Sequence, residues 1–214
     1  MIRLDIFSDP VCPWCLIGKA HLDRALEAAP DHPFAIAWHP FQLNPDMPVE
    51  GMDRATYLDA KFGGRDKAQR AYAQVEAAAL QAGIELDVAS VPFASNTLDA
   101  HRMIHWAGIE GRQSAMVSAL FRAYWKDQRD IADHQTLADI AADTGLDRAG
   151  IARLLESDAD RDDILARDRD ARAKGVNAVP TFLIAQQYVV SGAQPPDFWR
   201  QVIKDINAQA QQTP

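Results

Sequence analysis

The chain has 214 residues, 48% of them apolar, which is enough for one large domain, or one domain with an insertion, around a substantial core. Its 22 basic and 30 acidic residues give a net charge of −8, which argues against nucleic acid and anionic membranes as main partners, because both bind basic surfaces. The sequence lacks an apolar run of membrane-spanning length, and MIRLDIFSDP at its N-terminus lacks the features of a signal peptide. We therefore expect a cytoplasmic protein.

The start of the chain predicts a strand, a helix and a second strand. Residues 2–7 alternate apolar and polar side chains, and residues 34–41 form a second strand candidate. Between them, apolar residues recur at helical spacing after Pro13, and proline is favoured at the first position of a helix. This places Cys12 at the helix N-terminus and Cys15 one turn inside. The order strand, helix, strand predicts a right-handed crossover and a parallel pair.

Residues 53–174 have helical character and almost no strand signal. The helices that we expect span residues 54–62, 66–82, 97–108, 113–127, 134–144, 148–157 and 160–174. Candidate caps at their N-termini are Asp53, Asn96, Asp133 and Asp147. Charge alternates in sign along RDDILARDRDARAK at residues 161–174, so we expect this helix face to be solvated.

The pattern returns to strands near the C-terminus. Residues 178–185 and 188–192 predict an antiparallel hairpin with a tight turn at residues 186–187. A last helix begins near Pro195. Strand candidates therefore lie at both ends of the chain, with the helical block between them.

Neither end of the chain has enough strands to form a stable sheet alone. One compact α/β domain with a helical insertion therefore explains the order of elements better than two consecutive domains. We expect residues 1–52 and 175–214 to form this domain, and residues 53–174 to form an all-helical insertion.

Both cysteines of the chain lie in the motif Cys12-Pro13-Trp14-Cys15. A cysteine at a helix N-terminus meets the positive end of the helix dipole, which favours the reactive thiolate. A second cysteine one turn inside is placed to resolve a mixed disulfide. A strand feeding such a helix is the setting in which C-x-x-C indicates a thioredoxin-like redox motif. Trp14 offers the thiolate no donor from its carbon faces, so we expect a less oxidising couple than a C-P-H-C motif would give.

Two other interpretations of the cysteine pair stay open. A structural zinc site needs four ligands, and His101 and His105, which share a face of an expected helix, would join the cysteines only if the fold brought them together. A structural disulfide would close a very short loop, which constrains the unfolded chain little. Redox catalysis fits the placement of the pair best, and we expect no metal.

Four stretches of the chain together resemble the DsbA-like thioredoxin family and, within it, the FrnE-type cytosolic branch. They agree with it in order and spacing and span most of the chain. The stretches are DIFSDPVCPWCLIGK at 5–19, WHPFQLNPDMP at 38–48, SNTLDAHRMIHWA at 95–107 and GVNAVPTFLIAQQYVVSGAQPPDFW at 175–199.

The resemblance implies a thioredoxin-like fold interrupted by a large helical insertion, in agreement with the order of elements. It implies thiol–disulfide exchange, with Cys12 as the nucleophile and Cys15 as the resolving cysteine. It also implies that Pro180 is cis beside the substrate groove, and that the backbone at Val179 pairs with a bound peptide.

Further candidates for substrate contact lie near this groove. Pro13 and Trp14 stand between the two cysteines, and Asn96 and His101 would reach the groove from the insertion. Both also have a structural explanation, which we favour: Asn96 as a helix cap, and His101 as a packed or surface residue of its helix.

A related branch contains the 2-hydroxychromene-2-carboxylate isomerases and the kappa-class glutathione transferases, which share this fold and insertion. In that branch a serine that activates glutathione replaces the first cysteine. The corresponding residue here is Cys12, with a partner at Cys15, and Ser8 lies before the helix as a poor substitute.

We therefore expect a thiol–disulfide oxidoreductase that reduces, forms or isomerises disulfides in proteins or small thiols. The cysteine pair carries the electrons, so no cofactor is required, and glutathione is a candidate co-substrate. A redox partner must recycle the pair. The alternatives are a glutathione-dependent isomerase or transferase and a zinc-binding protein without enzyme activity. Strand edges and five tryptophans permit a homodimer.

Overall fold

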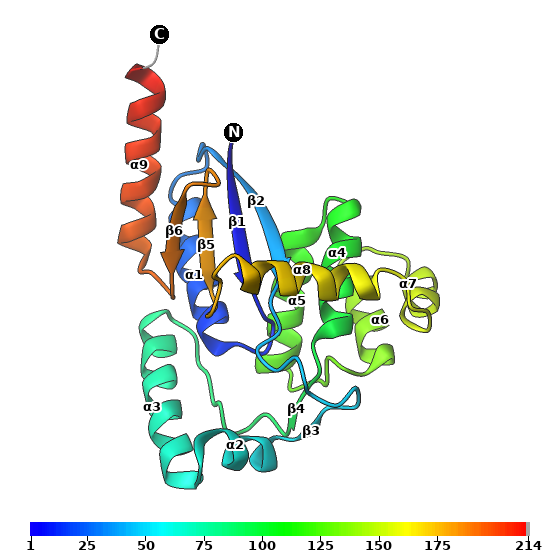
Figure 1. Ribbon diagram of the computed structural model, residues 1–214. Helices are drawn as coiled ribbons and strands as arrows, with labels where there is room; N and C mark the ends of the chain where they lie inside the picture. Colours follow the sequence, from blue (N-terminus) through cyan, green and yellow to red (C-terminus); the bar gives the residue numbers. More distant parts are fainter. Residues whose placement is uncertain (213–214) are drawn as a thin grey trace.

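The computed structural model describes residues 1–212, apart from the side chains of residues 65, 66 and 210–212, and shows a mixed sheet with helices packed around it (Figure 1). The sheet has the order β2-β1-β5-β6, with β1 parallel to β2 and antiparallel to β5, and β5 antiparallel to β6. The predicted parallel pair and hairpin are therefore confirmed, and both ends of the chain share one sheet. Its strands are β1 (Ile2–Ser8), β2 (Phe34–Pro40), β5 (Thr181–Ile184) and β6 (Tyr188–Ser191).

Two helices from opposite ends of the chain pack against each other beside the sheet. Helix α1 (Pro13–Glu27) makes the crossover from β1 to β2, and α9 (Pro196–Gln212) packs on it. Trp199 of α9 is fully buried, with ring centroids 4.7 Å from Phe182 of β5 and 5.4 Å from Phe198. Edge-to-face contacts of this kind add to the burial of the rings and fix the last helix to the sheet.

Helices fill most of the chain between β2 and β5, as predicted. Three of them begin at predicted caps, Asp53, Asp133 and Asp147, whose carboxylates accept hydrogen bonds from N–H groups of the first turn. The ends of the helices lie within two residues of the predicted ones. The helices are α2 (Arg54–Phe62), α3 (Arg65–Gln81), α4 (Leu98–Ile109), α5 (Gln113–Trp125), α6 (His134–Asp143), α7 (Arg148–Leu155) and α8 (Arg161–Ala173).

The cap of α4 differs from the prediction. Thr97 is the N-cap residue, and Asn96 lies one residue outside the helix. The Asn96 side chain nevertheless serves the helix start, because its Oδ1 accepts a hydrogen bond from the N–H of Leu98 at 2.9 Å. Its amide nitrogen donates to the carbonyl of Met47 at 2.7 Å and ties α4 to the loop that follows β2.

The helical segment also contains a short ladder that was not predicted. Strand β3 (Met52–Asp53) pairs with β4 (Phe93–Ala94), and two residues are too few to leave an alternating pattern in the sequence. This ladder lies across the predicted domain boundary at residues 52 and 53. The division into two domains stays a prediction.

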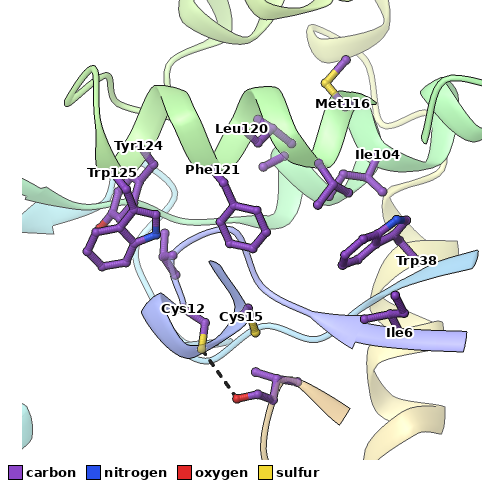
Figure 2. Packing of buried hydrophobic residues seen from close by; sticks show 14 of the residues in the cluster. Ile6, Cys12, Cys15, Trp38, Ile104, Met116, Leu120, Phe121, Tyr124 and Trp125 are labelled. Atoms are coloured by element: carbon purple, nitrogen blue, oxygen red, sulfur yellow. Dashed lines mark hydrogen bonds between the residues drawn. The ribbon is translucent and has the colours of Figure 1, made fainter. Parts of the chain in front are cut away.

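The helices and the sheet share one hydrophobic core (Figure 2). The side chain of Gln113, at the start of α5, accepts from the N–H of Trp38 at 2.9 Å and donates to its carbonyl at 3.1 Å. Both backbone groups belong to β2, which is an edge strand and would otherwise present them unpaired. The start of α5 is thus attached directly to the sheet.

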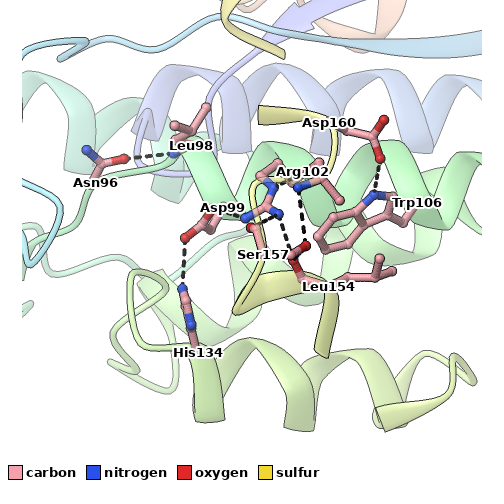
Figure 3. Close-up of polar contacts among 10 residues, drawn as sticks. Asn96, Leu98, Asp99, Arg102, Trp106, His134, Leu154, Ser157 and Asp160 are labelled. Atoms are coloured by element: carbon pink, nitrogen blue, oxygen red, sulfur yellow. Dashed lines mark hydrogen bonds and ion pairs between the residues drawn. The ribbon is translucent and has the colours of Figure 1, made fainter. Parts of the chain in front are cut away.

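Arg102 of α4 holds the connection between α7 and α8 (Figure 3). Its guanidinium donates to the carbonyls of Leu154, Ser157 and Ala159 at 2.7–2.8 Å. It also forms an ion pair with Asp99, one turn earlier on α4, at 2.7 Å. The residue is only 1% exposed, so these bonds satisfy a buried charge and fix where α8 begins.

The described helices pack on the sheet or on one another. Within residues 1–212, no helix is both long enough and apolar enough to cross a membrane.

Arg102→Met removes the charge and all of these hydrogen bonds while keeping an unbranched apolar side chain. We expect the free energy of unfolding to fall by about 3–5 kcal/mol, because a buried ion pair with Asp99 and three buried hydrogen bonds to carbonyls are lost. Urea denaturation measures the change. The matched control is Arg148→Met, whose side chain is 49% exposed and whose loss should cost less than about 1 kcal/mol. Equal losses in the two variants would contradict the role of Arg102.

Candidate active site

The two cysteines lie at the start of α1, as predicted. Cys12 is the N-cap residue, Pro13 is the first helical residue, and the N–H of Cys15 donates to the carbonyl of Cys12 at 3.1 Å. The N–H of Cys12 donates to the carbonyl of Asp9 at 2.9 Å, which closes a turn between β1 and α1. Both cysteines are free thiols, and Cys12 is 3% exposed and Cys15 1% exposed.

Cys12 lies next to the segment that leads into β5. Its thiol donates to the carbonyl of Val179 at 3.6 Å, and the Val179–Pro180 peptide bond is cis (Figure 2). Helix α1 approaches this segment closely at Gly18, where an added Cβ would lie 2.9 Å from Cγ of Pro180. The lack of a side chain at residue 18 therefore allows Pro180 to sit beside the cysteine pair.

The two thiols have different surroundings. Cys12 lines a pocket of about 380 Å³, whereas Cys15 is not among the described residues of its wall. Burial raises the pKa of the Cys15 thiol well above its usual value, and the adjacent Cys12 side chain raises it further. Cys12 is thus the sulfur that a molecule in the pocket meets first, and Cys15 stands behind it as a neutral thiol.

The pocket is formed between the cysteine turn and the first helices of the insertion. Trp14, 39% exposed, belongs to its wall, together with Pro13 and Val179. Its charged side chains are Arg54 and Lys61, and none of its described lining residues is acidic. The wall further includes Val11, Leu43, Asn44, Tyr57, Leu58, Phe62, Tyr72, Val75, Val88, Ser95, Tyr124, Asn177 and Ala178.

Asp9 is buried directly behind the cysteine turn. Its carboxyl oxygens accept from the N–H groups of Leu43 at 2.7 Å and Val11 at 3.4 Å, so it joins the turn to the loop after β2. Burial raises the pKa of this carboxyl to about 7. Nε2 of His101 lies 3.8 Å away and has no hydrogen-bond partner among the described residues, and burial lowers the pKa of this imidazole to about 4. Desolvation thus favours the neutral form of both groups.

The far side of the same loop is fixed by Asp168 of α8. Its carboxylate accepts from the N–H of Gln42 and from Arg172, each at 2.8 Å. Asp168 is only 4% exposed, so the prediction of a fully solvated face for residues 161–174 was wrong at this position. The charge pattern could not reveal the buried amide that Asp168 serves.

The DSBA-like thioredoxin domain family matches residues 3–204 of the chain. The chain belongs to this family. A probable DsbA oxidoreductase from Streptomyces coelicolor is 31% identical, with a TM-score of 0.86 over 100% of this chain and 92% of the other.

Two further solved structures share the fold of this DSBA-like domain. The cytosolic disulfide reductase DsbM from Pseudomonas aeruginosa, solved with GSH, is 19% identical, with a TM-score of 0.69 over 96% of this chain and 99% of the other. A 2-hydroxychromene-2-carboxylate isomerase is 16% identical, with a TM-score of 0.71 over 98% and 97%. At these identities the likeness concerns the fold alone.

The structure brings some of the predicted site residues together and leaves others apart. Pro13, Trp14 and Val179 line the pocket with Cys12, and Pro180 adjoins it. Asn96 and His101 are not among the described lining residues. Asn96 donates to the carbonyl of Met47 and accepts from the N–H of Leu98, and Figure 3 shows the second of these bonds. His101 is 3% exposed and lies behind Asp9. Their contact with substrate stays a prediction.

The histidines considered for zinc have other neighbours. His101 adjoins Asp9, and Nδ1 of His105 lies 3.2 Å from the guanidinium of Arg167. Across the described part of the chain, no group of three or more histidine, cysteine, aspartate or glutamate side chains is placed to hold a metal ion.

Sequence reasoning missed Asp9 and Arg54 in this DSBA-like domain. Asp9 stands three residues before Cys12, and that proximity is the signal that could have drawn attention to it. Arg54 follows the predicted cap Asp53, where a basic residue gives no sign of burial. It is nevertheless 7% exposed and lines the pocket.

Asp9→Asn tests the burial of this carboxyl through its effect on pH dependence. As the pH rises from about 4 to 7, Asp9 ionises in the unfolded chain, where its pKa is the ordinary 3.8, but stays protonated in the folded protein. The folded state then binds more protons, so stability falls with rising pH, and the full loss is reached above pH 7. The parent should lose roughly 4 kcal/mol relative to the variant across this window, at about 1.4 kcal/mol per pKa unit.

Urea denaturation of both proteins near pH 4 and pH 8 measures this difference. His101 contributes a slope of the opposite sign to both proteins, so it cancels in the comparison. The variant also exchanges one acceptor for a donor, but that offset does not vary with pH. A difference between parent and variant that is the same at both pH values would contradict the raised pKa of Asp9.

Proposed function

We propose that the protein is a thiol–disulfide oxidoreductase in which Cys12 attacks the substrate and Cys15 resolves the mixed disulfide. The observation that carries this proposal is the asymmetry of the pair: Cys12 lines the pocket at a helix N-terminus, and Cys15 is sealed one turn behind it. Membership of the DSBA-like thioredoxin domain family and the likeness to a probable DsbA oxidoreductase support it.

In the reducing direction, the Cys12 thiolate attacks one sulfur of a substrate disulfide. A bond forms between Cys12 and that sulfur, and the other substrate sulfur leaves as a thiolate that takes a proton from water. Cys15 then loses its proton and attacks the sulfur of Cys12, which releases the second substrate thiol. The substrate disulfide gains two electrons and two protons, and the cysteine pair is oxidised to a disulfide. A dithiol or two molecules of glutathione return the enzyme to the reduced state.

Burial of Cys15 orders these two steps. Its raised pKa keeps it protonated while Cys12 is free, so it does not compete for the substrate. Formation of the mixed disulfide removes the neighbouring Cys12 thiol, one of the groups that raise this pKa. Cys15 is then one helical turn from the sulfur that it must attack.

Substrate contact is proposed for the residues around the Cys12 sulfur. Trp14 and Pro13 offer apolar surface, and the cis segment Val179–Pro180 offers backbone groups for pairing with an extended peptide, as in strand addition. The DsbM structure with GSH supports glutathione as a co-substrate. The cytosolic neighbour likewise supports a place in the cytosol, in the FrnE-type branch. A homodimer stays a prediction.

A glutathione-dependent isomerase is the second candidate, because a 2-hydroxychromene-2-carboxylate isomerase has the same fold. That activity needs a residue that activates glutathione but has no use for a resolving thiol. The resemblance places a serine where this chain has Cys12, and Cys15 would then have no role. Disulfide exchange uses both cysteines and is therefore favoured.

Replacement of each cysteine separates their roles. Cys12→Ser should reduce disulfide reduction to the uncatalysed rate, because a hydroxyl does not form the mixed disulfide. Cys15→Ala should leave the attack intact but trap the substrate on Cys12, visible by mass spectrometry as an adduct of half the substrate. Turnover of both variants is compared with the parent in a coupled assay with dithiothreitol as the reductant, whereas the adduct is sought after incubation with substrate alone, because dithiothreitol would reduce the mixed disulfide.

Turnover by Cys12→Ser at the parent rate would contradict the assignment of the nucleophile. A Cys15→Ala protein that yields no adduct would contradict the assignment of the resolving cysteine. Conversion of 2-hydroxychromene-2-carboxylate with glutathione by Cys15→Ala, at the rate of the parent, would favour the isomerase instead.

A further inference from the structure

Arg54 is a buried cation that forms no ion pair with any acidic side chain that the structure describes. It begins α2 and is 7% exposed. Its Nε donates to the carbonyl of Val88 at 3.2 Å, and its Nη1 donates to the hydroxyl of Tyr124 at 2.8 Å. The third nitrogen, Nη2, makes no hydrogen bond to any residue in the described part of the chain, and no described carboxylate forms an ion pair with Arg54.

Both hydrogen-bond partners of Arg54 are neutral. The hydroxyl of Tyr124 donates to the carbonyl of Phe93 at 2.9 Å, and burial raises the pKa of this hydroxyl, so it carries no compensating charge. The rings of Tyr124 and Trp125 lie 5.9 and 5.3 Å from the guanidinium carbon and supply only the weaker attraction of aromatic faces. A buried charge left uncompensated is unfavourable, and among the described residues no anion offsets the charge of Arg54. An anionic ligand would therefore stabilise this site.

Arg54 and Cys12 line the same pocket. Lys61 adds a second positive charge to its wall, and none of the described lining residues is acidic, in a chain whose net charge is −8. Asp53, the cap of α2, and Asp59 within α2 line a neighbouring groove to which Arg54 also belongs. Neither forms an ion pair with Arg54. The pocket volume of about 380 Å³ is in the range of sites for small molecules.

We propose that Arg54 binds the carboxylate of an anionic disulfide or thiol substrate while the Cys12 sulfur exchanges with its sulfur. This assignment rests on the proposed function, because it names the substrate class of the same pocket. Nη2 of Arg54, at the start of α2, donates to a carboxylate oxygen of the substrate. Lys61, in the last turn of α2, adds electrostatic attraction for the same carboxylate. Guanidinium suits this role because its donors lie in a fixed plane that matches a carboxylate, and its charge persists at all relevant pH values.

The carboxylate could belong to a small disulfide or to an acidic side chain beside a peptide disulfide. Small probes test the first source. They are 3,3′-dithiodipropionate, which is a dianion, bis(2-hydroxyethyl) disulfide, which is neutral, and cystamine, which is a dication. For each probe kcat/KM is divided by its uncatalysed rate with dithiothreitol, because the three disulfides differ in intrinsic reactivity. We expect the order anion, neutral, cation, with the anion favoured over the neutral probe by about tenfold or more.

Two peptides with an intramolecular disulfide test the second source. They differ only in carrying glutamate or glutamine next to the cysteines. Two ratios of kcat/KM are then compared: glutamate peptide to glutamine peptide, and anionic small probe to neutral small probe. A larger ratio for the peptides identifies a peptide carboxylate as the natural ligand. A larger preference among the small probes identifies a small anionic disulfide.

Arg54→Gln links the preference to this residue. The ratio of kcat/KM for the anionic probe to kcat/KM for the neutral probe should fall by about tenfold, chiefly because KM for the anionic probe rises. Arg54→Lys should restore part of this ratio. The matched control is Arg122→Gln on α5, which removes the same charge from a side chain that is 71% exposed and lines a different groove. This control should leave the ratio unchanged. A ratio that is the same in Arg54→Gln and the parent would overturn the proposal.

Two further outcomes keep the tests separate. If Arg54→Gln does not fold, the series on the parent protein decides, because a parent without preference for anions in either set of probes overturns the proposal. If the parent turns over none of the disulfides, the proposed function fails. In that case calorimetry measures the binding of 3-mercaptopropionate to two proteins, Cys12→Ser alone and Cys12→Ser combined with Arg54→Gln. Binding to the first protein and not to the second supports the role of Arg54. Absence of binding to both proteins overturns the proposal.

Discussion

The pairing of β1 with β5 is the interaction on which the site depends. It joins segments from opposite ends of the chain, and its register sets Phe7 opposite Thr181. The next residue before Thr181 is Pro180, and Val179 then meets the Cys12 sulfur, 167 residues away in the sequence. Side chains alternate along a strand, so a slip of one residue in this register would turn the β5 side chains to the other face and remove Val179 from Cys12.

The helical segment contributes more than a cover for the sheet. The indole of Trp125 on α5 donates to the carbonyl of Pro10 at 3.0 Å and holds the turn that carries Cys12. Asp168 on α8 and Asp9 hold neighbouring amides of the loop after β2, and Arg102 fixes the start of α8. Buried hydrogen bonds with specific partners thus fix the position of the pocket wall relative to Cys12. Apolar packing alone would fix this position less closely, because it is not directional.

The four strands of the main sheet, the helices and the placement of the cysteines could be predicted because each has a local signal, whereas the two-residue strands β3 and β4 have none. Pro13 sets a helix start, Asp53 and Asp133 cap helices through their own first turns, and period-two alternation indicates β1. The roles of Arg54 and Asp168 could not be predicted, because charged residues on a helix resemble a solvated face until the fold supplies a buried partner. Asn96 shows a third case: its side chain does bond to the helix start, but backbone geometry makes Thr97 the cap.

The redox equilibrium of the Cys12–Cys15 pair tests the central claim most directly. The protein is equilibrated with mixtures of reduced and oxidised glutathione, and free thiols are trapped by alkylation and counted by mass spectrometry. Tryptophan fluorescence, to which Trp14 between the cysteines contributes, follows the same transition. The account predicts a single reversible two-electron transition, with a potential closer to that of thioredoxin, about −270 mV, than to that of DsbA, about −120 mV. Thiols that stay reduced and unreactive across the whole series would contradict it.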